Sequence, residues 1–293
     1  FAERTRAYMK IEDGCDRYCT YCIIPTARGS VRSKPLAEIA AEAETLSRAG
    51  FSEIVLVGIN LTSYGKGENI DICDAVAAAA RPDGIKRVRL GSLEPDHISD
   101  SVLERLKAQK KFCPQFHLSL QSGCDETLKR MNRHYDTAFY RDLVSRIRAV
   151  FEDASVTTDV MVGFAGETDE EFSKSLAFVK EIGFAKTHVF AYSRRRGTVA
   201  YGLPAQITRA EKAERSRRMI ETALACEEEF LKGLVGKTEY VLFETAEKGF
   251  AEGYTPNYSR VRVKSDEPHT GEILPVKIVS AEKECCIGEI EAV

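Results

Sequence analysis

The chain has 293 residues, of which 43% are hydrophobic and 30% charged, and its formal net charge is -3. It is long enough to bury a large core, and the weak negative charge excludes a uniformly basic nucleic-acid binder, so any nucleic-acid surface has to be a local patch. No apolar run reaches the roughly 18 residues of a membrane span and no signal peptide opens the chain, so we expect a cytoplasmic protein without a membrane partner. Nine cysteines without regular paired spacing favour reduced thiols or metal ligands over a disulfide scaffold.

Between residue 7 and about residue 192, short β-branched runs alternate with amphipathic helical stretches, a pattern typical of repeated βα units. Apolar residues at helical spacing predict helices over 36–46 and 139–150, and Thr168 with Glu171 forms a capping box for another helix that ends near Gly183. The predicted strands cover residues 7–11, 53–59, 87–93, 116–120, 156–164 and 187–192. We therefore expect an α/β fold with parallel strands covered by helices.

The pattern changes in the last quarter of the chain. A second capping box, Thr208 with Glu211, opens a long charged helix that we expect to run to about Leu234. After Gly236 come short alternating strands over 238–244, 258–264, 273–282 and 286–292, which predict a small β-barrel. We place the domain boundary between residues 234 and 235.

Near the start of the chain, three cysteines fall within eight positions in the spacing C-x3-C-x2-C: Cys15, Cys19 and Cys22. Structural zinc needs four ligands, and no second pair follows at a suitable distance, because the adjacent Cys285 and Cys286 point to opposite faces of a strand. Three thiolates from one loop instead suit a 4Fe-4S cluster whose fourth iron stays open to another ligand. The alternative of three unrelated loop cysteines is disfavoured, because the loop follows a strand directly and contains Gly14 and Gly29, which let backbone approach a cluster.

The cysteine motif, the aromatic Tyr21 before its last cysteine and the six βα units resemble the radical S-adenosylmethionine (SAM) superfamily. The segments "EIVLVGINLTSYG", "HLSLQSG", "TDVMVGFAGETDEEF" and "RRRGTVAY" resemble the methylthiotransferases of that superfamily, and "GYTPNYSRVRV" resembles their RNA-binding TRAM domain. The resemblance implies a partial (βα)6 TIM-like radical SAM barrel over residues 1–234, followed by a small all-β TRAM barrel over residues 235–293.

The resemblance also implies the cofactors. The three cysteines would hold a 4Fe-4S cluster whose open iron is chelated by SAM, and one electron from the cluster would cleave SAM to a 5′-deoxyadenosyl radical that abstracts hydrogen. An electron donor such as a flavodoxin-type protein is implied, whereas the sulfur donor is not indicated. Similar family members carry an additional amino-terminal domain with a second 4Fe-4S cluster for sulfur insertion. Since the chain begins at Phe1, we expect that cluster only in the full-length protein, and we expect this chain to cleave SAM without completing methylthiolation.

Polar side chains at or near the ends of the predicted strands are candidates for SAM binding, with Gly58 and Asn60 in the segment that resembles the family's SAM amino-group site. A turn or helix-cap role is the alternative for each of them, and no residue is assigned to catalysis. Ala165 stands where the family more usually has proline, and we expect little loss of function from this difference. The SAM-binding candidates are Tyr21, Gly58, Asn60, Glu94, Ser119, Gln121 and Asp159.

Positive charge is concentrated between residues 194 and 218, where eight basic residues face two acidic ones, a balance of +6. A solvated helix face is the alternative to an RNA-binding patch there. Residues 237–293 carry 7 Lys or Arg and 11 Asp or Glu, so RNA contacts in that region have to be local. The RNA-binding candidates are Arg194, Arg195, Arg196, Tyr254, Tyr258, Arg260 and Arg262.

Three branches of the family act on different substrates. The segments "CDRYCTYCIIPTARG", "LPAQITRAEKAERS" and "GYTPNYSRV" most resemble the branch that methylthiolates carbon 2 of N6-threonylcarbamoyladenosine, next to the anticodon of tRNA. The expected partner is therefore a tRNA anticodon arm. The alternatives are methylthiolation of isopentenyladenosine in tRNA or of a ribosomal-protein aspartate, and, outside enzymes, a cluster-carrying RNA-binding module.

Overall fold

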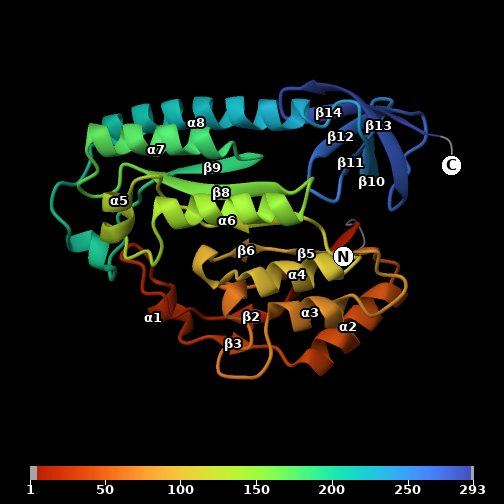
Figure 1. Cartoon of the computed structure of the whole chain (residues 1–293), viewed down its shortest axis with the longest axis horizontal. Helices are drawn as coiled ribbons and strands as arrows, with labels where there is room; N and C mark the ends of the chain where they lie inside the picture. Colours follow the sequence, from red (N-terminus) through yellow and green to blue (C-terminus); the bar gives the residue numbers. More distant parts are fainter. Residues whose placement is uncertain (1–4, 292–293) are drawn as a thin grey trace.

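The computed structural model describes residues 5–291, and its first part is a curved wall of parallel strands that follow one another in chain order (Figure 1). Within each of the two sheets that form the wall, neighbouring strands pair in parallel and in chain order, as βα units require. The strands are β1 (Arg6–Lys10), β4 (Glu53–Val57), β5 (Arg87–Leu90), β6 (Ser92–Leu93), β7 (Gln115–Leu118), β8 (Ser155–Val162) and β9 (Lys186–Ala191). The predicted α/β class with parallel strands is confirmed.

The wall bends at Gly91, where the predicted strand 87–93 is divided between two sheets. Its first half, β5, closes the sheet β1-β4-β5, and its second half, β6, opens the sheet β6-β7-β8-β9. The amide of Gly91 donates to Leu56 O at 2.9 Å, and a Cβ at Gly91 would lie 3.3 Å from that oxygen, so the bend favours glycine. The two edge strands, β1 and β9, leave one side of the wall open.

Helices cover the outer face of the wall, with α7 and α8 along one side and α2, α3 and α4 along the other (Figure 1). The capping boxes at Thr168 and Thr208 form as predicted, and Gly183 ends α7 in the left-handed conformation at φ 62°. The helix α8 ends at Lys232, slightly before the predicted Leu234. The helices are α1 (Ile24–Arg28), α2 (Leu36–Arg48), α3 (Ile72–Ala79), α4 (Asp100–Ala108), α5 (Asp125–Arg130), α6 (Thr137–Val150), α7 (Asp169–Ile182) and α8 (Arg209–Lys232), with 3-10 turns η1 (Leu61–Ser63), η2 (Pro95–His97) and η3 (Val199–Gly202).

Side chains alternate across the strands, so that one face builds the core and the other lines the interior of the wall. On β7, Phe116 and Leu118 are fully buried in the core, whereas His117 between them points inward. On β8, Val160 and Val162 are buried in the core, and Asp159 lines the interior. The inward face is therefore where polar side chains collect. None of the helices between residues 5 and 291 is long and apolar enough to span a bilayer.

The second part of the structure is a closed barrel in the strand order β10-β11-β12-β14-β13, at the end of α8 (Figure 1). This confirms the predicted terminal β-barrel, but β11 was not predicted, because Gly253 interrupts its apolar alternation. A Cβ at Gly253 would lie 2.2 Å from Leu242 O, so strand packing explains this glycine. The strands are β10 (Thr238–Glu247), β11 (Phe250–Tyr254), β12 (Arg260–Lys264), β13 (Ile273–Glu282) and β14 (Cys285–Ile290). The expected boundary at residues 234–235 falls in the short connection after α8 and stays a prediction.

A loop of the terminal barrel, residues 254–259, is fixed against the amino-terminal ends of the parallel strands. Arg87 Nη1 donates to Tyr254 O at 3.0 Å, and Arg89 Nη1 donates to Pro256 O at 2.9 Å. The side-chain Nδ2 of Asn257 donates to Asp153 O at 3.0 Å. Between the arginines lies Glu53, 1% exposed, which accepts from Arg89 Nε at 3.1 Å. Buried charges are tolerated here because they are paired and hydrogen-bonded.

We predict that Glu53→Gln destabilises the chain by about 3–5 kcal/mol, because it leaves buried guanidinium groups without their shared carboxylate. Urea denaturation followed by circular dichroism measures this change. The control is Glu228→Gln, which removes an exposed ion pair with Lys232 on α8 and should cost less than about 1 kcal/mol. A loss at Glu53 as small as that of the control would contradict the assigned role.

Candidate functional site

The three motif cysteines lie in a loop whose two ends are closed on each other. The amide of Cys15 donates to Gly29 O at 3.0 Å, and the short strands β2 (Glu12–Asp13) and β3 (Arg32–Ser33) pair beside this contact. Gly14 has φ +90°, and a Cβ there would lie 2.1 Å from Ser30 O, so only glycine fits. The loop is therefore held as a closed ring.

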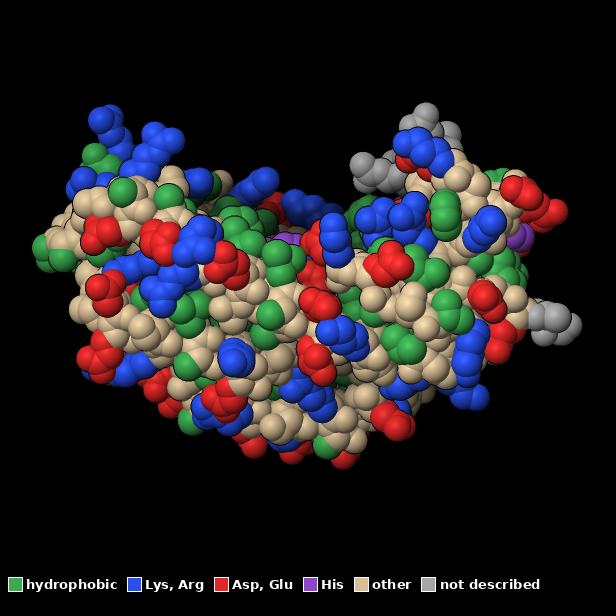
Figure 2. Space-filling model, turned by 90° about the horizontal axis from the view of Figure 1, so that it is seen from above, with side chains coloured by type: hydrophobic (Ala, Val, Ile, Leu, Met, Phe, Trp, Pro, Cys, Tyr) green, Lys and Arg blue, Asp and Glu red, His purple; other side chains and the backbone are tan. Residues whose placement is uncertain are grey.

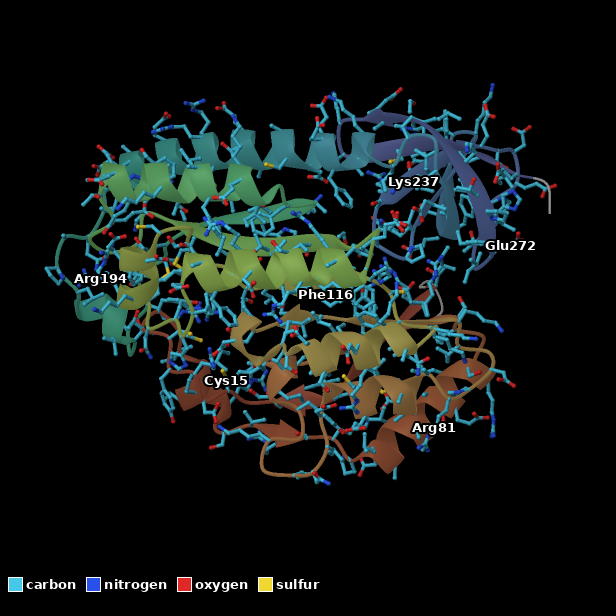
Figure 3. The ribbon with its side chains drawn as sticks, viewed as in Figure 1. Cys15, Arg81, Phe116, Arg194, Lys237 and Glu272 are labelled. Carbon is cyan, nitrogen blue, oxygen red and sulfur yellow. The ribbon has the colours of Figure 1, made fainter. Side chains whose placement is uncertain are left out.

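Two distant segments anchor the middle of this loop through Thr20. Its amide donates to Met131 O at 3.0 Å and its hydroxyl to Arg130 O at 2.9 Å, both at the end of α5. Its carbonyl accepts from the amide of Ala200 in η3 at 2.8 Å. The loop therefore lies at the same end of the molecule as Arg194, opposite the terminal barrel (Figure 3).

Each motif sulfur has an N–H donor nearby. Arg133 Nη1 donates to Cys19 Sγ at 3.1 Å, the amide of Ile24 lies 3.5 Å from Cys22 Sγ, and Asn60 Nδ2 lies 4.0 Å from Cys15 Sγ. All three thiols are free. Such N–H groups stabilise thiolates and tune the potential of an iron–sulfur cluster.

The donor set fits a cluster better than a single metal ion. Within residues 5–291, no three His, Cys, Asp or Glu side chains converge closely enough to hold one ion. The thiols nevertheless share one loop and interact electrostatically, since Cys19 contributes to raising the pKa of both Cys15 and Cys22. Three free thiols on one loop, each with an N–H donor nearby, suit the 4Fe-4S group that the sequence predicts.

Arg133, which the sequence analysis did not identify, links the cysteine loop to the strand ends. Its side chain is 2% exposed, and Nη2 donates to Glu94 Oε2 at 2.5 Å and to Ser119 O at 3.2 Å. Nε donates to the hydroxyl of Tyr135 at 3.0 Å. Arg133 therefore brings two of the predicted SAM-binding residues, Glu94 and Ser119, next to Cys19. No motif marks it, because it lies in an irregular turn after α5.

Glu12, also missed, fixes the segment that contains Gly58 and Asn60. Its Oε2 accepts from the amide of Asn60 at 2.8 Å, and a Cβ at Gly58 would lie 2.6 Å from that oxygen. The other carboxyl oxygen of Glu12 is buried and has no hydrogen-bond partner among the described residues. Burial raises the pKa of the Glu12 carboxyl group. The side-chain Nδ2 of Asn60 donates to Ser63 Oγ at 2.8 Å and lies 4.0 Å from the Cys15 sulfur.

Of the other SAM-binding candidates, Asp159 and Gln121 lie on and beside β8, whereas Tyr21 lies in the cysteine loop. Asp159 Oδ2 lies 3.4 Å from His117 Nε2, and the amide of Gln121, at φ 68°, donates to Asp159 O at 2.8 Å. Tyr21 packs edge-to-face on Phe164, and burial raises its pKa well above the ordinary value. SAM binding by these residues stays a prediction.

A cavity of about 680 Å³ occupies the interior of the wall on its open side. It is lined by inward side chains of β1, β4, β5, β7, β8 and β9, and it extends from Asp159 and Phe190 to Tyr254 and Tyr258 of the terminal barrel. In the space-filling view the surface is hollowed between the basic end of the molecule and the terminal barrel (Figure 2). The cavity is polar on the β7–β9 side, where His117, Asp159 and His188 meet.

The basic segment is less free than its sequence implied. Arg215 is buried between Glu167 and Asp169, and Arg217 pairs with Glu214 and Glu221, so acidic partners neutralise part of the positive charge of this segment. Arg194 donates to Tyr201 O at 2.6 Å. Arg195 and Arg196 follow it in the same loop and are exposed. Their side chains make no ion pair or hydrogen bond to other residues in the described range. The exposed arginines of residues 194–218 whose side chains make no ion pair or hydrogen bond in the described range are therefore Arg195 and Arg196 of this loop and Arg209 and Arg218 of α8.

The candidates in the terminal barrel are engaged within the protein. Tyr254 and Tyr258 stack on each other with ring centroids 4.7 Å apart, and the Arg89 guanidinium lies over Tyr258 at 4.7 Å. Arg260 and Arg262 both pair with Glu252. RNA binding by these four residues stays a prediction, and it requires them to exchange their present partners.

We predict that Cys15 and Cys22 of the metal-free chain are alkylated by iodoacetamide more slowly than in the urea-unfolded chain. Burial raises their pKa above the ordinary 9.0, so less of the reactive thiolate is present at a given pH. Mass spectrometry of rates against pH measures this, and the folded rates should keep rising as the pH passes 9. If the alkylation rate of the folded chain stopped rising at a lower pH than the rate of the unfolded chain, the predicted increase in the pKa of these thiols would be wrong.

Comparison with known proteins places these features in a family. The family model of the radical SAM superfamily matches residues 9–179. The chain is 38% identical over 288 residues to a threonylcarbamoyladenosine tRNA methylthiotransferase of Bacillus subtilis, covering 96% of this chain and 64% of that protein. It is 39% identical over 290 residues to a tRNA-2-methylthio-N(6)-dimethylallyladenosine synthase of Clostridium perfringens, covering 97% and 65%. The chain thus spans about two thirds of the length of these relatives.

Solved structures share the fold at low identity. The radical SAM methyltransferase TsrM of Kitasatospora setae, with cobalamin and a [4Fe-4S] cluster bound, matches with a TM-score of 0.56 at 15% identity, over 84% of this chain and 42% of that one. Methylornithine synthase matches with a TM-score of 0.53 at 16% identity, over 74% and 62%. The predicted resemblance is confirmed, and the chain belongs to the radical SAM superfamily.

Proposed function

We propose that this protein methylthiolates carbon 2 of N6-threonylcarbamoyladenosine, next to the anticodon of tRNA, by radical SAM chemistry in the cytoplasm. The observation that carries the proposal is the closed loop of three free thiols, each with an N–H donor, at the carboxyl ends of the parallel strands. Similarity to tRNA methylthiotransferases over almost the whole chain supports it.

In this proposal Cys15, Cys19 and Cys22 hold a 4Fe-4S cluster, with SAM beside it on the strand ends. The bound pair would supply one-electron cleavage of SAM and thereby abstraction of an unactivated carbon-bound hydrogen. Arg133 keeps a positive charge against Cys19, and Asn60, which follows the carboxyl end of β4, lies 4.0 Å from the Cys15 sulfur. A flavodoxin-type protein is the proposed electron donor, and the structure does not indicate a sulfur donor.

The substrate branch is chosen on two grounds. Relatives named for threonylcarbamoyladenosine and for dimethylallyladenosine are about equally similar, so identity alone does not separate them. The interior cavity presents His117, Asp159 and His188, which suit a polar substituent better than a hydrocarbon one. A cluster-carrying RNA-binding module without catalysis is the second candidate, because exposed Arg195 and Arg196 lie close to the cluster loop.

We predict that anaerobic reconstitution loads about four irons per chain, with broad brown absorbance, and that reduction with SAM then releases 5′-deoxyadenosine. Replacing the three motif cysteines together by alanine should abolish both. Cys285→Ala is the control, since that cysteine lies in the terminal barrel, and it should leave both unchanged. Full iron in the triple variant would refute the cluster assignment. Iron and tRNA binding without deoxyadenosine would support the non-catalytic module.

We predict that the double variant Arg195→Ala, Arg196→Ala binds tRNA about tenfold more weakly at low salt, because both guanidinium groups are exposed and have no acidic partner in the described range. The affinity of the variant should also fall less steeply with salt, by the amount expected for the loss of about two phosphate contacts. Fluorescence anisotropy over a series of salt concentrations measures affinity and slope. The control is Arg217→Ala, which removes a guanidinium already paired with two glutamates. Equal slopes for the double variant and the wild type would move the phosphate contacts elsewhere.

A further inference from the structure

His188 stands in the middle of β9 with its side chain exposed toward the interior cavity. Its ring centroid lies 5.9 Å from that of His117. No hydrogen bond or ion pair engages the His188 ring anywhere between residues 5 and 291. It is thus a hydrogen-bonding group at the cavity wall that the folded chain leaves uncommitted.

The neighbours of His188 differ from it in this respect. His117 is fixed between Thr157 Oγ1, at 2.9 Å, and Asp159 Oδ2, at 3.4 Å. Lys186, also on β9, pairs with Glu227 at 3.2 Å and with Glu284 at 3.7 Å. The second oxygen of Asp159 has no hydrogen-bond partner among the described residues. The cavity therefore offers one free imidazole and one free carboxylate oxygen on the same wall.

The position of this wall fits a ligand that enters from solvent through the open side. Tyr8 on β1 and Phe190 on β9 line the cavity at the two edge strands and are 44% and 54% exposed. Aromatic faces at such a rim suit a nucleobase, which stacks on them. The opening lies in the hollow between the basic end and the terminal barrel (Figure 2).

We propose that this cavity receives the N6 substituent of the target adenosine, and that His188, together with Asp159, selects a substituent carrying a carboxylate and N–H or O–H donors. This proposal assigns Asp159 to the substrate in place of the SAM contact expected from the sequence. The inference rests on the proposed function and adds the residues that read its substrate. A threonylcarbamoyl group offers a carboxylate to the imidazole N–H, and amide and hydroxyl donors to Asp159. An isopentenyl group offers neither.

The selectivity follows from desolvation. Each polar group that a hydrocarbon substituent covers loses water without gaining a partner, which disfavours that complex on the order of tenfold. Burial also lowers the pKa of His188, although the nearby Asp159 acts in the opposite direction, and this favours the neutral ring, which has one N–H to donate. A donor on one residue and an acceptor on the other match the two ends of the polar substituent.

The test measures the affinity of this chain for anticodon stem-loops that carry threonylcarbamoyladenosine or isopentenyladenosine, by fluorescence anisotropy. The wild type should prefer the first on the order of tenfold, and His188→Phe should reduce the ratio to within about twofold. His188→Gln, which keeps an N–H donor, should retain most of the preference. Thr187→Val is the matched control, because its buried hydroxyl, unpaired among the described residues, faces away from the cavity on the same strand, and it should leave the ratio unchanged.

The outcomes separate this inference from the proposed function. Equal wild-type affinity for both stem-loops, or an unchanged preference in a folded His188→Phe chain, overturns the inference and leaves tRNA binding intact. If His188→Phe does not fold, His188→Ala replaces it in the test. Loss of the preference in His188→Ala supports the inference, and an unchanged preference overturns it. Failure of the wild type to bind any stem-loop overturns the proposed tRNA substrate together with the inference.

Discussion

The arrangement of the site depends on one buried cation, Arg133. It donates to the Cys19 sulfur, to Glu94 and to the carbonyl of Ser119, and so joins the cysteine loop to two strand ends. Burial alone would disfavour its charge, but Tyr135, Glu94 and the other groups around it outweigh burial and raise its pKa well above the ordinary value. The guanidinium therefore stays charged beside Cys19, where it stabilises the thiolate that an iron–sulfur cluster needs.

A second set of buried charges fixes the other end of the molecule. Arg87 and Arg89, held by Glu53, donate to backbone carbonyls of the terminal barrel, so that barrel is oriented by directional bonds rather than by apolar contact alone. The loop so bound closes the amino-terminal end of the interior. The cavity is thus closed at this end and open at its side.

Sequence reasoning recovered the features that local patterns encode. The strand periods, the capping boxes at Thr168 and Thr208 and the spacing of the motif cysteines are local, and each predicted its element. Arg133 and Glu12 could not be found in this way, because their roles arise from contacts across the fold, to Cys19 and Asn60. A lone arginine in an irregular turn carries no period and no spacing.

The charge balance of residues 194–218 also shows that contacts across the fold cannot be counted from the sequence, and here the sequence overestimated a feature instead of missing one. Counting residues 194–218 made the whole segment an RNA patch, yet acidic partners outside that window, such as Glu167 on Arg215 and Glu221 on Arg217, neutralise part of it. Arginines without an ion pair in the described range remain exposed in the loop at residues 194–196, at the end of the molecule opposite the terminal barrel (Figure 3), and at Arg209 and Arg218 of α8. An RNA that contacted both ends would have to cross the hollow between them, over the open side of the wall. A nucleotide leaving the stack at that point would face Tyr8, Phe190 and the polar interior behind them, so the placement of charge and the position of the cavity favour the same path for the substrate.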